Sequence, residues 1–335
     1  MSNIAVMGGG AWGTALALNL SERGGHDIVL WTHSPKVAET IRATRENTAF
    51  LPGFPFPQTV SVTSNAAEAL TNAEIVLSVM PSHHVRDSYA SFAPHLRSGQ
   101  LLVSATKGIE DRTGLRMSEV IADALAAHSL HLPIAVLSGP SFAQEVAAGS
   151  PTAVTIASGD LKIAARVQHE FASRTLRLYT NEDVIGVELG GALKNVIALA
   201  AGAVSGLGLG HNSTAALITR GIAEITRLAT ACGGRRETLA GLSGLGDLVL
   251  TCTGSLSRNR FIGMELGKGH SLAQALAALN GKVAEGVRTT SAALELAARH
   301  HVEMPIAEQV HAILYQAKHP SEAIQDLMGR PGRDE

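Results

Sequence analysis

Residues 2–31 read SNIAVMGGGAWGTALALNLSERGGHDIVLW, and this stretch decides the fold of the first half of the chain. An apolar run leads into the pattern Gly8-x-Gly10-x-x-Gly13, good helix formers follow, and a second apolar run ends at Trp31. This order predicts a strand, a glycine turn, a helix and a second strand. The first glycine of such a turn allows a tight bend, the second lets the backbone approach a pyrophosphate, and the third lets the helix pack on the strand. The stretch therefore predicts a dinucleotide site, with the pyrophosphate at the helix start.

The residues after the second predicted strand bear on which dinucleotide binds. A carboxylate at this point would hydrogen-bond the free 2′-hydroxyl of NAD. This chain has Thr32-His33-Ser34-Pro35-Lys36 instead. Nothing acidic repels a 2′-phosphate here, and His33 and Lys36 are placed to meet one, so NADPH is favoured and NAD is not excluded. Both residues also fit an ordinary solvated loop.

Composition limits the class of protein. The 335 residues are enough for two domains, and 45% apolar content with 34 glycines is typical of a packed, turn-rich globular chain. A net charge of −2 offers no basic face for nucleic acid. Cys232 and Cys252 form no C-x-x-C pair and no metal-like cluster, so we predict no metal site and a reduced, cytoplasmic protein. Met1 lies just before the first predicted strand, which leaves no room for a signal peptide.

One segment tests whether the chain enters a membrane. Residues 195–219 contain no Asp, Glu, Lys or Arg, and the segment is long enough to cross a bilayer. It also carries four glycines, at 202, 206, 208 and 210, followed by His211. These residues break a lipid-facing helix, so we expect a buried helix, a glycine turn and a second helix start, with no transmembrane segment.

The rest of the first half alternates between apolar runs and helical stretches. Nearly continuous apolar runs at 74–80, 101–106 and 134–137 predict a parallel sheet that is covered on both faces. Ligands bind beyond the carboxyl ends of such strands, so the residues that follow each run matter most. Lys107 follows the second run and is the one cation at these strand exits. It is a candidate for substrate or cofactor binding as well as an ordinary surface lysine.

The pattern changes near residue 182. Strand signals fade after 177–179, and capping residues at 180–183 mark a junction. From Val184 the chain reads as helices almost throughout, and the first of them is apolar on all sides, which indicates a buried core helix. We predict an α/β Rossmann-like N-terminal domain with a mostly parallel sheet at 1–182, followed by an all-α C-terminal domain at 183–335.

Two charged residues stand in apolar surroundings in the second half. Lys194 lies inside the apolar helix, where lost hydration disfavours its charged form and brings its pKa toward the working pH. That makes it a candidate proton donor and acceptor, although a lysine whose head reaches water fits as well. Asp247 lies in the apolar run 242–250, where a carboxylate is costly without a partner. Lys194 is the obvious partner, but the sequence does not show that the two meet.

A third candidate site begins at Ser257. Ser257-Arg258-Asn259-Arg260 precedes an apolar stretch and reads as a helix with a serine cap. A helix start and a guanidinium together form a phosphate site. Arg258 and Arg260 point in different directions on a helix, so at most one holds the phosphate directly. An ordinary capped surface helix is the alternative.

Together these segments resemble one known family, the bacterial type of NAD(P)-dependent glycerol-3-phosphate dehydrogenase. The resemblance runs from Ile4 to about Arg330, and several motifs in order are more specific than any one of them. The motifs are Gly8-Gly9-Gly10-Ala11-Trp12-Gly13-Thr14-Ala15, Ser104-Ala105-Thr106-Lys107-Gly108, Leu137-Ser138-Gly139-Pro140-Ser141-Phe142-Ala143, Gly190-Gly191-Ala192-Leu193-Lys194-Asn195, Gly244-Leu245-Gly246-Asp247-Leu248, Ser257-Arg258-Asn259 and Val283-Ala284-Glu285-Gly286.

The resemblance implies a set of site residues. With the glycines of the turn, Gly8, Gly10 and Gly13, the implied cofactor contacts are Ala11, Trp12, His33, Lys107, Ala143, Arg258, Val283 and Glu285. The implied substrate contacts are Lys107, Gly139, Ser141, Lys194, Asp247, Ser257, Arg258 and Asn259. His33 stands where many relatives carry arginine, which bears on the NADP preference.

The resemblance also implies a reaction. Hydride passes between the nicotinamide and C2 of dihydroxyacetone phosphate, Lys194 transfers the proton, Lys107 stabilises the developing negative oxygen, and Asp247 holds Lys194. The product, sn-glycerol 3-phosphate, would supply phospholipid synthesis, and the apolar helical half suggests a homodimer. Two alternatives stay open: another reductase of the same plan acting on a keto or hydroxy acid, such as a ketopantoate reductase, and a non-catalytic NADP-binding sensor. Retention of Lys194 and Asp247 in apolar stretches argues against the sensor.

Overall fold

The structure is a computed structural model, and it describes residues 2–279 and 281–332. The chain forms two compact units, Met1–Lys107 with Arg116–Val187, and Gly108–Leu115 with Glu188–Glu335. The short segment 108–115 thus belongs with the helical unit, although it lies within the first half of the sequence. The domain division at 182 and 183 remains a prediction.

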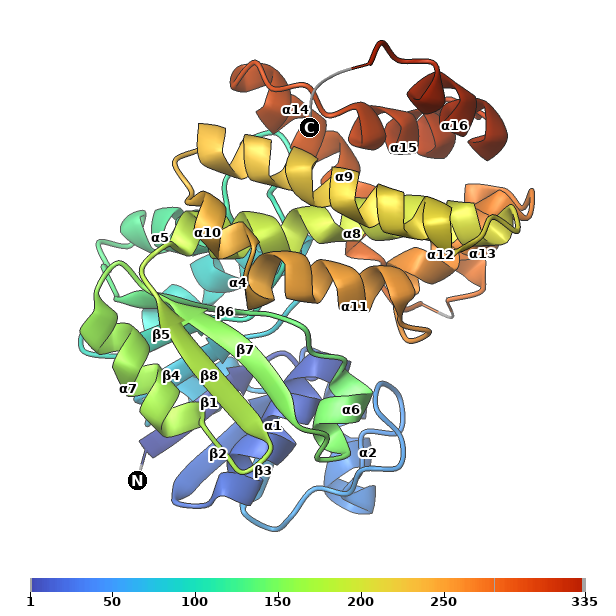
Figure 1. The fold of residues 1–335 in the computed structure, drawn as a ribbon. Coiled ribbons are helices and arrows are strands. Elements are labelled where there is room, and N and C mark those ends of the chain that lie inside the picture. The colour runs from blue at the N-terminus through green and yellow to red at the C-terminus, as the bar shows by residue number, and fades with distance from the viewer. Residues whose placement is uncertain (1, 280, 333–335) are drawn as a thin grey trace. The chain divides into compact units, whose positions relative to one another are not determined.

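A mixed sheet lies at the centre of the first unit (Figure 1). Among the described residues it has eight strands in the order β3-β2-β1-β4-β5-β6-β7-β8, and every neighbouring pair is parallel except β6 and β7. In the middle of the sheet, Ile4 is in register with Ile28 on one side and with Ile75 on the other. The strands are β1 (Ser2–Met7), β2 (His26–Trp31), β3 (Val60–Thr63), β4 (Ile75–Ser78), β5 (Leu101–Ser104), β6 (Ile134–Ser138), β7 (Thr152–Ala157) and β8 (Leu176–Asn181).

Amphipathic helices cover this sheet. Leu16 and Leu20 of α1 are fully buried in the same apolar cluster as the strand residues, and so are Val167 and Phe171 of α7, which packs against β7 and β8. The helices of this unit are α1 (Ala11–Arg23), α2 (Pro35–Thr44), α3 (Ala66–Leu70), α4 (Val85–Phe92), α5 (Met117–Ala126), α6 (Ala143–Ala147) and α7 (Leu161–Phe171), with short 3-10 turns η1 (Ser82–His84) and η2 (Ala93–His95).

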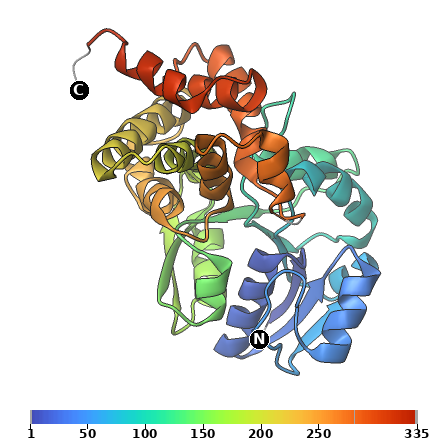
Figure 2. The same cartoon turned by 90° about the vertical axis from the view of Figure 1, so that its right-hand side faces the viewer.

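The second unit is helical and is built around α8 (Val184–Gly206). Small residues let its neighbours pack directly on its backbone. A Cβ added at Gly263 would lie 1.9 Å from the Leu199 carbonyl oxygen, so only glycine allows this approach. Its other elements are α9 (His211–Ala231), α10 (Arg236–Leu239), the π-helical turn η3 (Leu242–Gly246), α11 (Asp247–Thr253), α12 (Arg258–Gly267), α13 (Leu272–Ala277), α14 (Glu285–Arg299), α15 (Pro305–Tyr315) and α16 (Pro320–Met328). The last two pack side by side (Figure 2).

The predicted fold class is confirmed: an α/β unit with a mostly parallel sheet precedes a helical region. The charge-free segment is also the predicted helix, glycine turn and helix start. Helix α8 is long and apolar enough to cross a membrane, but 83% of its apolar window is buried within the described structure, as in the core helix of a globular protein. The sequence did not predict strand β3 or the antiparallel pairing of β6 with β7.

Candidate active-site residues in the two units

The glycine turn of the first unit has the geometry of a dinucleotide site. Gly8 has φ +140°, and a Cβ there would lie 2.6 Å from the Val79 carbonyl oxygen. A Cβ at Gly13 would lie 1.9 Å from the Gly8 carbonyl oxygen. At Gly10, which precedes α1, an added Cβ would meet no described atom within 4 Å. Close packing therefore requires glycine at positions 8 and 13. Gly10 keeps space open in front of the helix start, where a pyrophosphate binds in such turns.

The residues after β2 form a capped helix start. Ser34 Oγ accepts a hydrogen bond from Val37 N–H (3.4 Å) and thereby caps α2. His33 and Lys36 are both exposed, and the His33 ring lies edge-on to Trp31 with ring centres 6.1 Å apart. Both side chains are thus accessible to a ligand, and the predicted preference for NADPH stays a prediction.

Three predicted site residues lie together at the carboxyl ends of β5 and β6. Lys107 Nζ donates to the carbonyl oxygen of Gly139 (3.2 Å), and Ser141 Oγ donates to the same oxygen (3.0 Å). Gly139 has φ +151°, and a Cβ there would lie 2.9 Å from the Cα of Val154. The glycine lets this loop fold tightly over β7, which brings the lysine and serine side chains to one carbonyl group.

Apolar residues near the start of α1 form a small cluster. Ala11, Trp12 and Ala143, all predicted cofactor contacts, pack against the buried side chains of Ala15, Leu51 and Val146. They are themselves only partly buried, so they border the glycine turn with accessible surface.

Lys194 and Asp247 meet in the core of the second unit. Lys194 Nζ donates to Asp247 Oδ1 (2.6 Å) and to Thr251 Oγ1 (2.5 Å), and the Thr251 hydroxyl donates to the backbone carbonyl of Asp247 (2.7 Å). The exposed fraction is 7% for Lys194, 1% for Asp247 and 3% for Thr251. A buried charge is costly unless it is paired and hydrogen-bonded, and both conditions are met here.

A glycine explains how this contact forms. A Cβ at Gly190 would lie 2.7 Å from the Ser243 carbonyl oxygen, so only glycine lets η3 approach α8 so closely. Lys194 is four residues further along α8, on the same face. The close approach at Gly190 therefore brings the start of α11, with Asp247, against the lysine.

Thr251 is a member of the site that sequence reasoning missed. A signal was available, because Asp247 and Thr251 are four residues apart and share one face of α11. A threonine in an apolar helix is common, however, so the spacing alone does not single it out.

The first turn of α12 has backbone N–H groups that its own helix does not use. Ser257 Oγ accepts from Arg260 N–H (3.2 Å), as predicted for a serine cap. The N–H groups of Arg258 and Asn259 come earlier in the turn and have no intrahelical acceptor, so they suit an anion. Arg260 points elsewhere, because its Nη2 donates to Ser205 Oγ (3.3 Å) at the end of α8.

Arg258 is the guanidinium that remains near this helix start. It is exposed as a residue, but its packed surroundings lower the pKa of its guanidinium, and the nearby Glu285 carboxylate raises it. Arginine nevertheless stays charged in proteins. Arg258 and Glu285, predicted from separate motifs, thus lie within electrostatic reach of each other.

The side-chain amide of Asn259 is engaged within the unit. Its Nδ2 donates to Asn195 Oδ1 (2.9 Å), and its Oδ1 accepts from Gly286 N–H (2.9 Å). Asn259 is 8% exposed. The amide therefore joins α8, α12 and α14, and only the backbone N–H of Asn259 is left to meet an anion at this helix start.

Comparison with known proteins identifies the family. The model of the NAD-dependent glycerol-3-phosphate dehydrogenase N-terminus matches residues 3–164, and the model of its C-terminus matches residues 183–325. The chain belongs to this family. Among its relatives, the glycerol-3-phosphate dehydrogenase (NAD(P)+) of Acidobacterium capsulatum is 67% identical over 338 residues, covering 100% of both chains. That of Koribacter versatilis is 60% identical, covering 100% of this chain and 99% of the relative.

A solved structure supports the same assignment. The crystal structure of glycerol-3-phosphate dehydrogenase from Coxiella burnetii matches with a TM-score of 0.93 and 40% identity, covering 98% of this chain and 99% of that one. An oxidoreductase of this family uses NAD or NADP, which agrees with the dinucleotide site predicted from the glycine pattern.

The predicted site residues of this family member fall into two groups. The first unit holds the glycine turn with Ala11 and Trp12, together with His33, Lys107, Gly139, Ser141 and Ala143. The second unit holds Lys194, Asp247, Ser257, Arg258, Asn259, Val283 and Glu285. Within each unit several of them are in contact, as described above, and their individual roles remain predictions.

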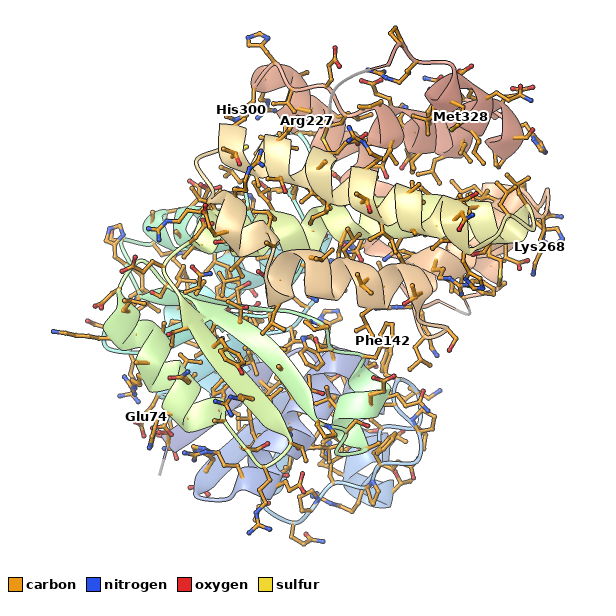
Figure 3. All side chains as sticks on the ribbon, viewed as in Figure 1. Glu74, Phe142, Arg227, Lys268, His300 and Met328 are labelled. Carbon is orange, nitrogen blue, oxygen red and sulfur yellow. The ribbon has the colours of Figure 1, made fainter. Side chains whose placement is uncertain are left out.

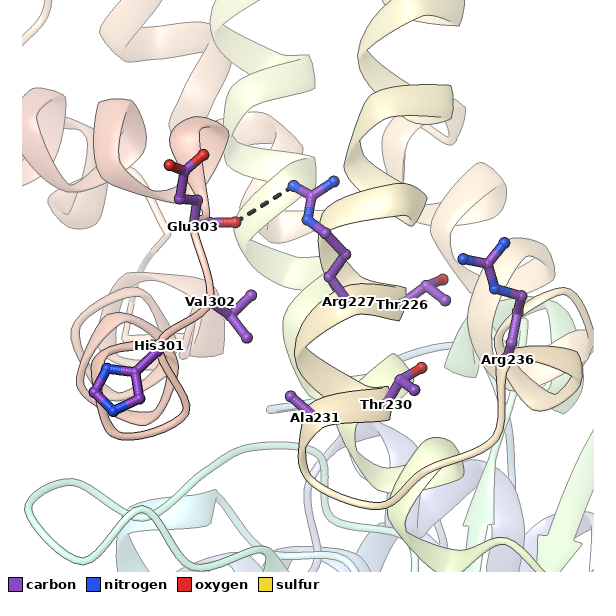
Figure 4. Close-up of a pocket in the computed structure, with 8 residues that line it drawn as sticks. All are labelled: Thr226, Arg227, Thr230, Ala231, Arg236, His301, Val302 and Glu303. Carbon is purple, nitrogen blue, oxygen red and sulfur yellow. Dashed lines mark hydrogen bonds between the residues drawn. The ribbon is translucent and has the colours of Figure 1, made fainter. Parts of the chain in front are cut away.

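A surface hollow in the helical unit is separate from these residues (Figure 4). It has a volume of about 610 Å³ and is lined by Thr226, Arg227, Thr230, Ala231, Arg236, His301, Val302 and Glu303. Arg227 lies on α9 (Figure 3), and its Nη2 donates to the Glu303 carbonyl oxygen (3.3 Å; Figure 4). None of the predicted site residues lines the hollow. In the described part of the chain, no group of three or more His, Cys, Asp or Glu side chains is arranged to hold a metal ion.

Proposed function

We propose that this protein is a glycerol-3-phosphate dehydrogenase that catalyses the reversible NAD(P)H-dependent reduction of dihydroxyacetone phosphate to sn-glycerol 3-phosphate. The observation that carries the proposal is the buried Lys194–Asp247–Thr251 cluster, in a chain that matches the family in both halves. A protein that only bound the dinucleotide would gain nothing from a buried lysine and carboxylate.

The residues of the glycine turn fit a dinucleotide. The space in front of Gly10 and the free N–H groups at the start of α1 suit a pyrophosphate. When bound, NAD(P)H supplies the hydride that reduces C2 of the ketone. Trp12 and Ala143 border the turn with apolar surface, and His33 and Lys36 are accessible for a 2′-phosphate.

Substrate binding is assigned to the start of α12. The substrate phosphate would accept from the backbone N–H groups of Arg258 and Asn259 and pair with the Arg258 guanidinium. These contacts lie at the end of the substrate that does not react. Their binding energy therefore serves to orient the carbonyl group.

Lys194 is the proton donor for the new hydroxyl group. As C2 gains a hydride, its oxygen becomes an alkoxide, and Lys194 Nζ gives it a proton and is later reprotonated from water. In the reverse direction, neutral Lys194 removes the proton from the hydroxyl. Asp247 and Thr251 orient Nζ through the bonds described above. Lys107 is assigned to the developing negative oxygen, where a preorganised cation lowers the barrier.

The cofactor preference, oligomeric state, location and metabolic use are part of the same proposal. The absence of an acid after β2 favours NADPH over NADH. A homodimer is inferred from the apolar helical unit, and a cytoplasmic location from two cysteines that form no C-x-x-C pair. Supply of phospholipid synthesis is the use that the family implies for the product. Sedimentation of the purified protein checks the dimer.

The test is the loss of nicotinamide absorbance when purified protein meets dihydroxyacetone phosphate with NADPH or NADH. Fast oxidation with the phosphorylated ketone, and little with dihydroxyacetone or ketopantoate, is expected. Turnover of ketopantoate in place of the phosphorylated ketone would favour the keto-acid reductase. Binding of NADPH without turnover of any of them would favour the sensor.

A further inference from the structure

The loop between α2 and β3 holds a buried asparagine against the glycine turn. Asn47 is 1% exposed. Its Nδ2 donates to the carbonyl oxygen of Gly9 (2.8 Å) and to Thr14 Oγ1 (2.7 Å). Gly9 lies on the strand side of the turn and Thr14 on its helix side, so one amide group ties the two sides together.

These two contacts fix the part of the turn that faces the pyrophosphate. Thr14 N–H donates to the Gly10 carbonyl oxygen (2.9 Å), which closes the first turn of α1. A Cβ at Gly9 would lie 2.7 Å from the Cβ of Thr32, so the turn is also packed tightly on the end of β2. A carbonyl oxygen can only accept a hydrogen bond, so Asn47 must direct its NH₂ group at Gly9. This requirement fixes the orientation of the side-chain amide.

The loop that carries Asn47 is itself anchored. Arg45, in the left-handed conformation with φ 57°, donates to the carbonyl oxygens of Phe56, Pro57 and Val60. Glu46 Oε1 accepts from Gly53 N–H (2.7 Å). The amide of Asn47 is therefore presented by a braced loop, and a braced group positions its partners better than a mobile one.

We propose that Asn47 is a positioning residue for the dinucleotide. It holds the Gly9 carbonyl and Thr14 so that the free N–H groups of the turn stay directed at the pyrophosphate. Asn47 lies 33 residues from Thr14 and outside the glycine pattern, so the pattern assigns it no role. The inference rests on the proposed function for its cofactor, and it concerns binding of the dinucleotide rather than the chemical step.

The experiment measures the Kd of NADPH by direct titration of the full-length protein. Asn47→Ala is expected to raise the Kd about tenfold, a change that corresponds to about 1.4 kcal/mol. At saturating NADPH, kcat and the KM for dihydroxyacetone phosphate stay within about twofold of wild type, because the substrate residues are untouched.

A matched control separates positioning from stability. Asn19 is 2% exposed, lies on the same helix α1 that Asn47 contacts, and donates to Thr175 Oγ1 (3.1 Å). Asn19→Ala therefore also removes a buried amide, and it is expected to lower the Tm while leaving the Kd of NADPH within about twofold. Thr14→Val removes one partner of Asn47 and keeps the side-chain shape, so it should raise the Kd by a smaller factor than Asn47→Ala.

Each outcome decides a separate claim. If wild type binds NADPH, and both Thr14→Val and a folded Asn47→Ala bind it equally well, Asn47 is only structural and the inference is wrong. Should Asn47→Ala fail to fold, an unchanged Kd in Thr14→Val alone overturns it, and a raised Kd supports it. If wild type binds neither NADPH nor NADH, the proposed function fails together with the inference.

Discussion

Two of the carboxylates that the helical unit buries, Asp247 and Glu224, have nearly equal exposure but different partners. Asp247 is 1% exposed and Glu224, on α9, is 2% exposed. Asp247 is neutralised by the ammonium of Lys194. Glu224 instead accepts from the backbone N–H groups of Ile306 (2.6 Å) and Ala307 (3.4 Å) in the first turn of α15. One carboxylate holds the ammonium group that we propose as the proton donor, and the other caps a helix.

The surroundings of Glu224 raise the pKa of its carboxyl group. Burial raises the pKa of Glu224 to about 7, although the N–H groups of Ile306 and Ala307 lower it. Arg227 also lowers it, and Glu308 raises it. Burial alone therefore does not mark a catalytic acid, and the partner of the buried group decides what it can do.

The largest effect is expected from Lys194. Lys194→Met should lower kcat by about 10²–10⁴-fold, because the proton donor is lost, and leave NADPH binding nearly intact. It also removes the ammonium that pairs with the buried Asp247, which should lower the free energy of unfolding by about 3–5 kcal/mol. Kinetics and chemical denaturation measure the two effects.

A double variant separates those effects. Lys194→Met with Asp247→Leu removes both charges, so stability should return toward wild type while activity stays lost. Near-normal turnover in either variant would show that Lys194 is not the proton-transfer group.

Arg258 should show the next largest effect. Arg258→Ala is expected to lower kcat/KM for dihydroxyacetone phosphate by about 10–100-fold, since a charged hydrogen bond to the phosphate is worth about 1.5–3 kcal/mol. Arg260→Ala is the matched control two residues away, and it should have a smaller effect because Arg260 bonds Ser205. Equal losses for the two arginines would contradict the assignment of the phosphate to Arg258.

Glu224 should affect stability and its dependence on pH. Its folded pKa of about 7 lies above its ordinary 4.5, so its contribution to stability is complete below about pH 4.5 and is lost as the pH rises through about 7. The loss is on the order of 3 kcal/mol. Glu224→Gln does not titrate. Between pH 5 and pH 8, its free energy of unfolding should therefore fall by less than that of wild type, and the difference should be roughly 3 kcal/mol. Parallel pH dependences in the two proteins would contradict this view.

Local patterns in the sequence predicted the first unit well. The strand, glycine turn and helix at 2–31 are fixed by residues close together in the chain, and the structure confirms them. The serine cap at Ser257 is equally local and is also confirmed. Strand β3 was missed because its four residues, VSVT, are too short for a clear pattern.

Long-range contacts were harder to predict. The sequence marked Lys194 and Asp247 as charges in apolar runs, but their contact spans 53 residues and depends on the close approach at Gly190. Asn47 and Glu224 were missed for the same reason, since their partners are 33 and 82 residues away. A polar side chain shows its purpose only when the fold brings its partner to it.

The most direct test of the central claim compares the two buried carboxylates in one assay. Asp247→Asn and Glu224→Gln each replace a buried carboxyl group by an amide at nearly equal burial, and kcat with NADPH and dihydroxyacetone phosphate is measured for both beside wild type. A hydrogen bond to a charged group is worth about 1.5–3 kcal/mol, so weakening the bond that orients Lys194 should lower kcat of Asp247→Asn by about 10–100-fold, while Glu224→Gln stays within about twofold. Similar values of kcat for the two variants would contradict the claim that Asp247 serves the chemistry and Glu224 the fold.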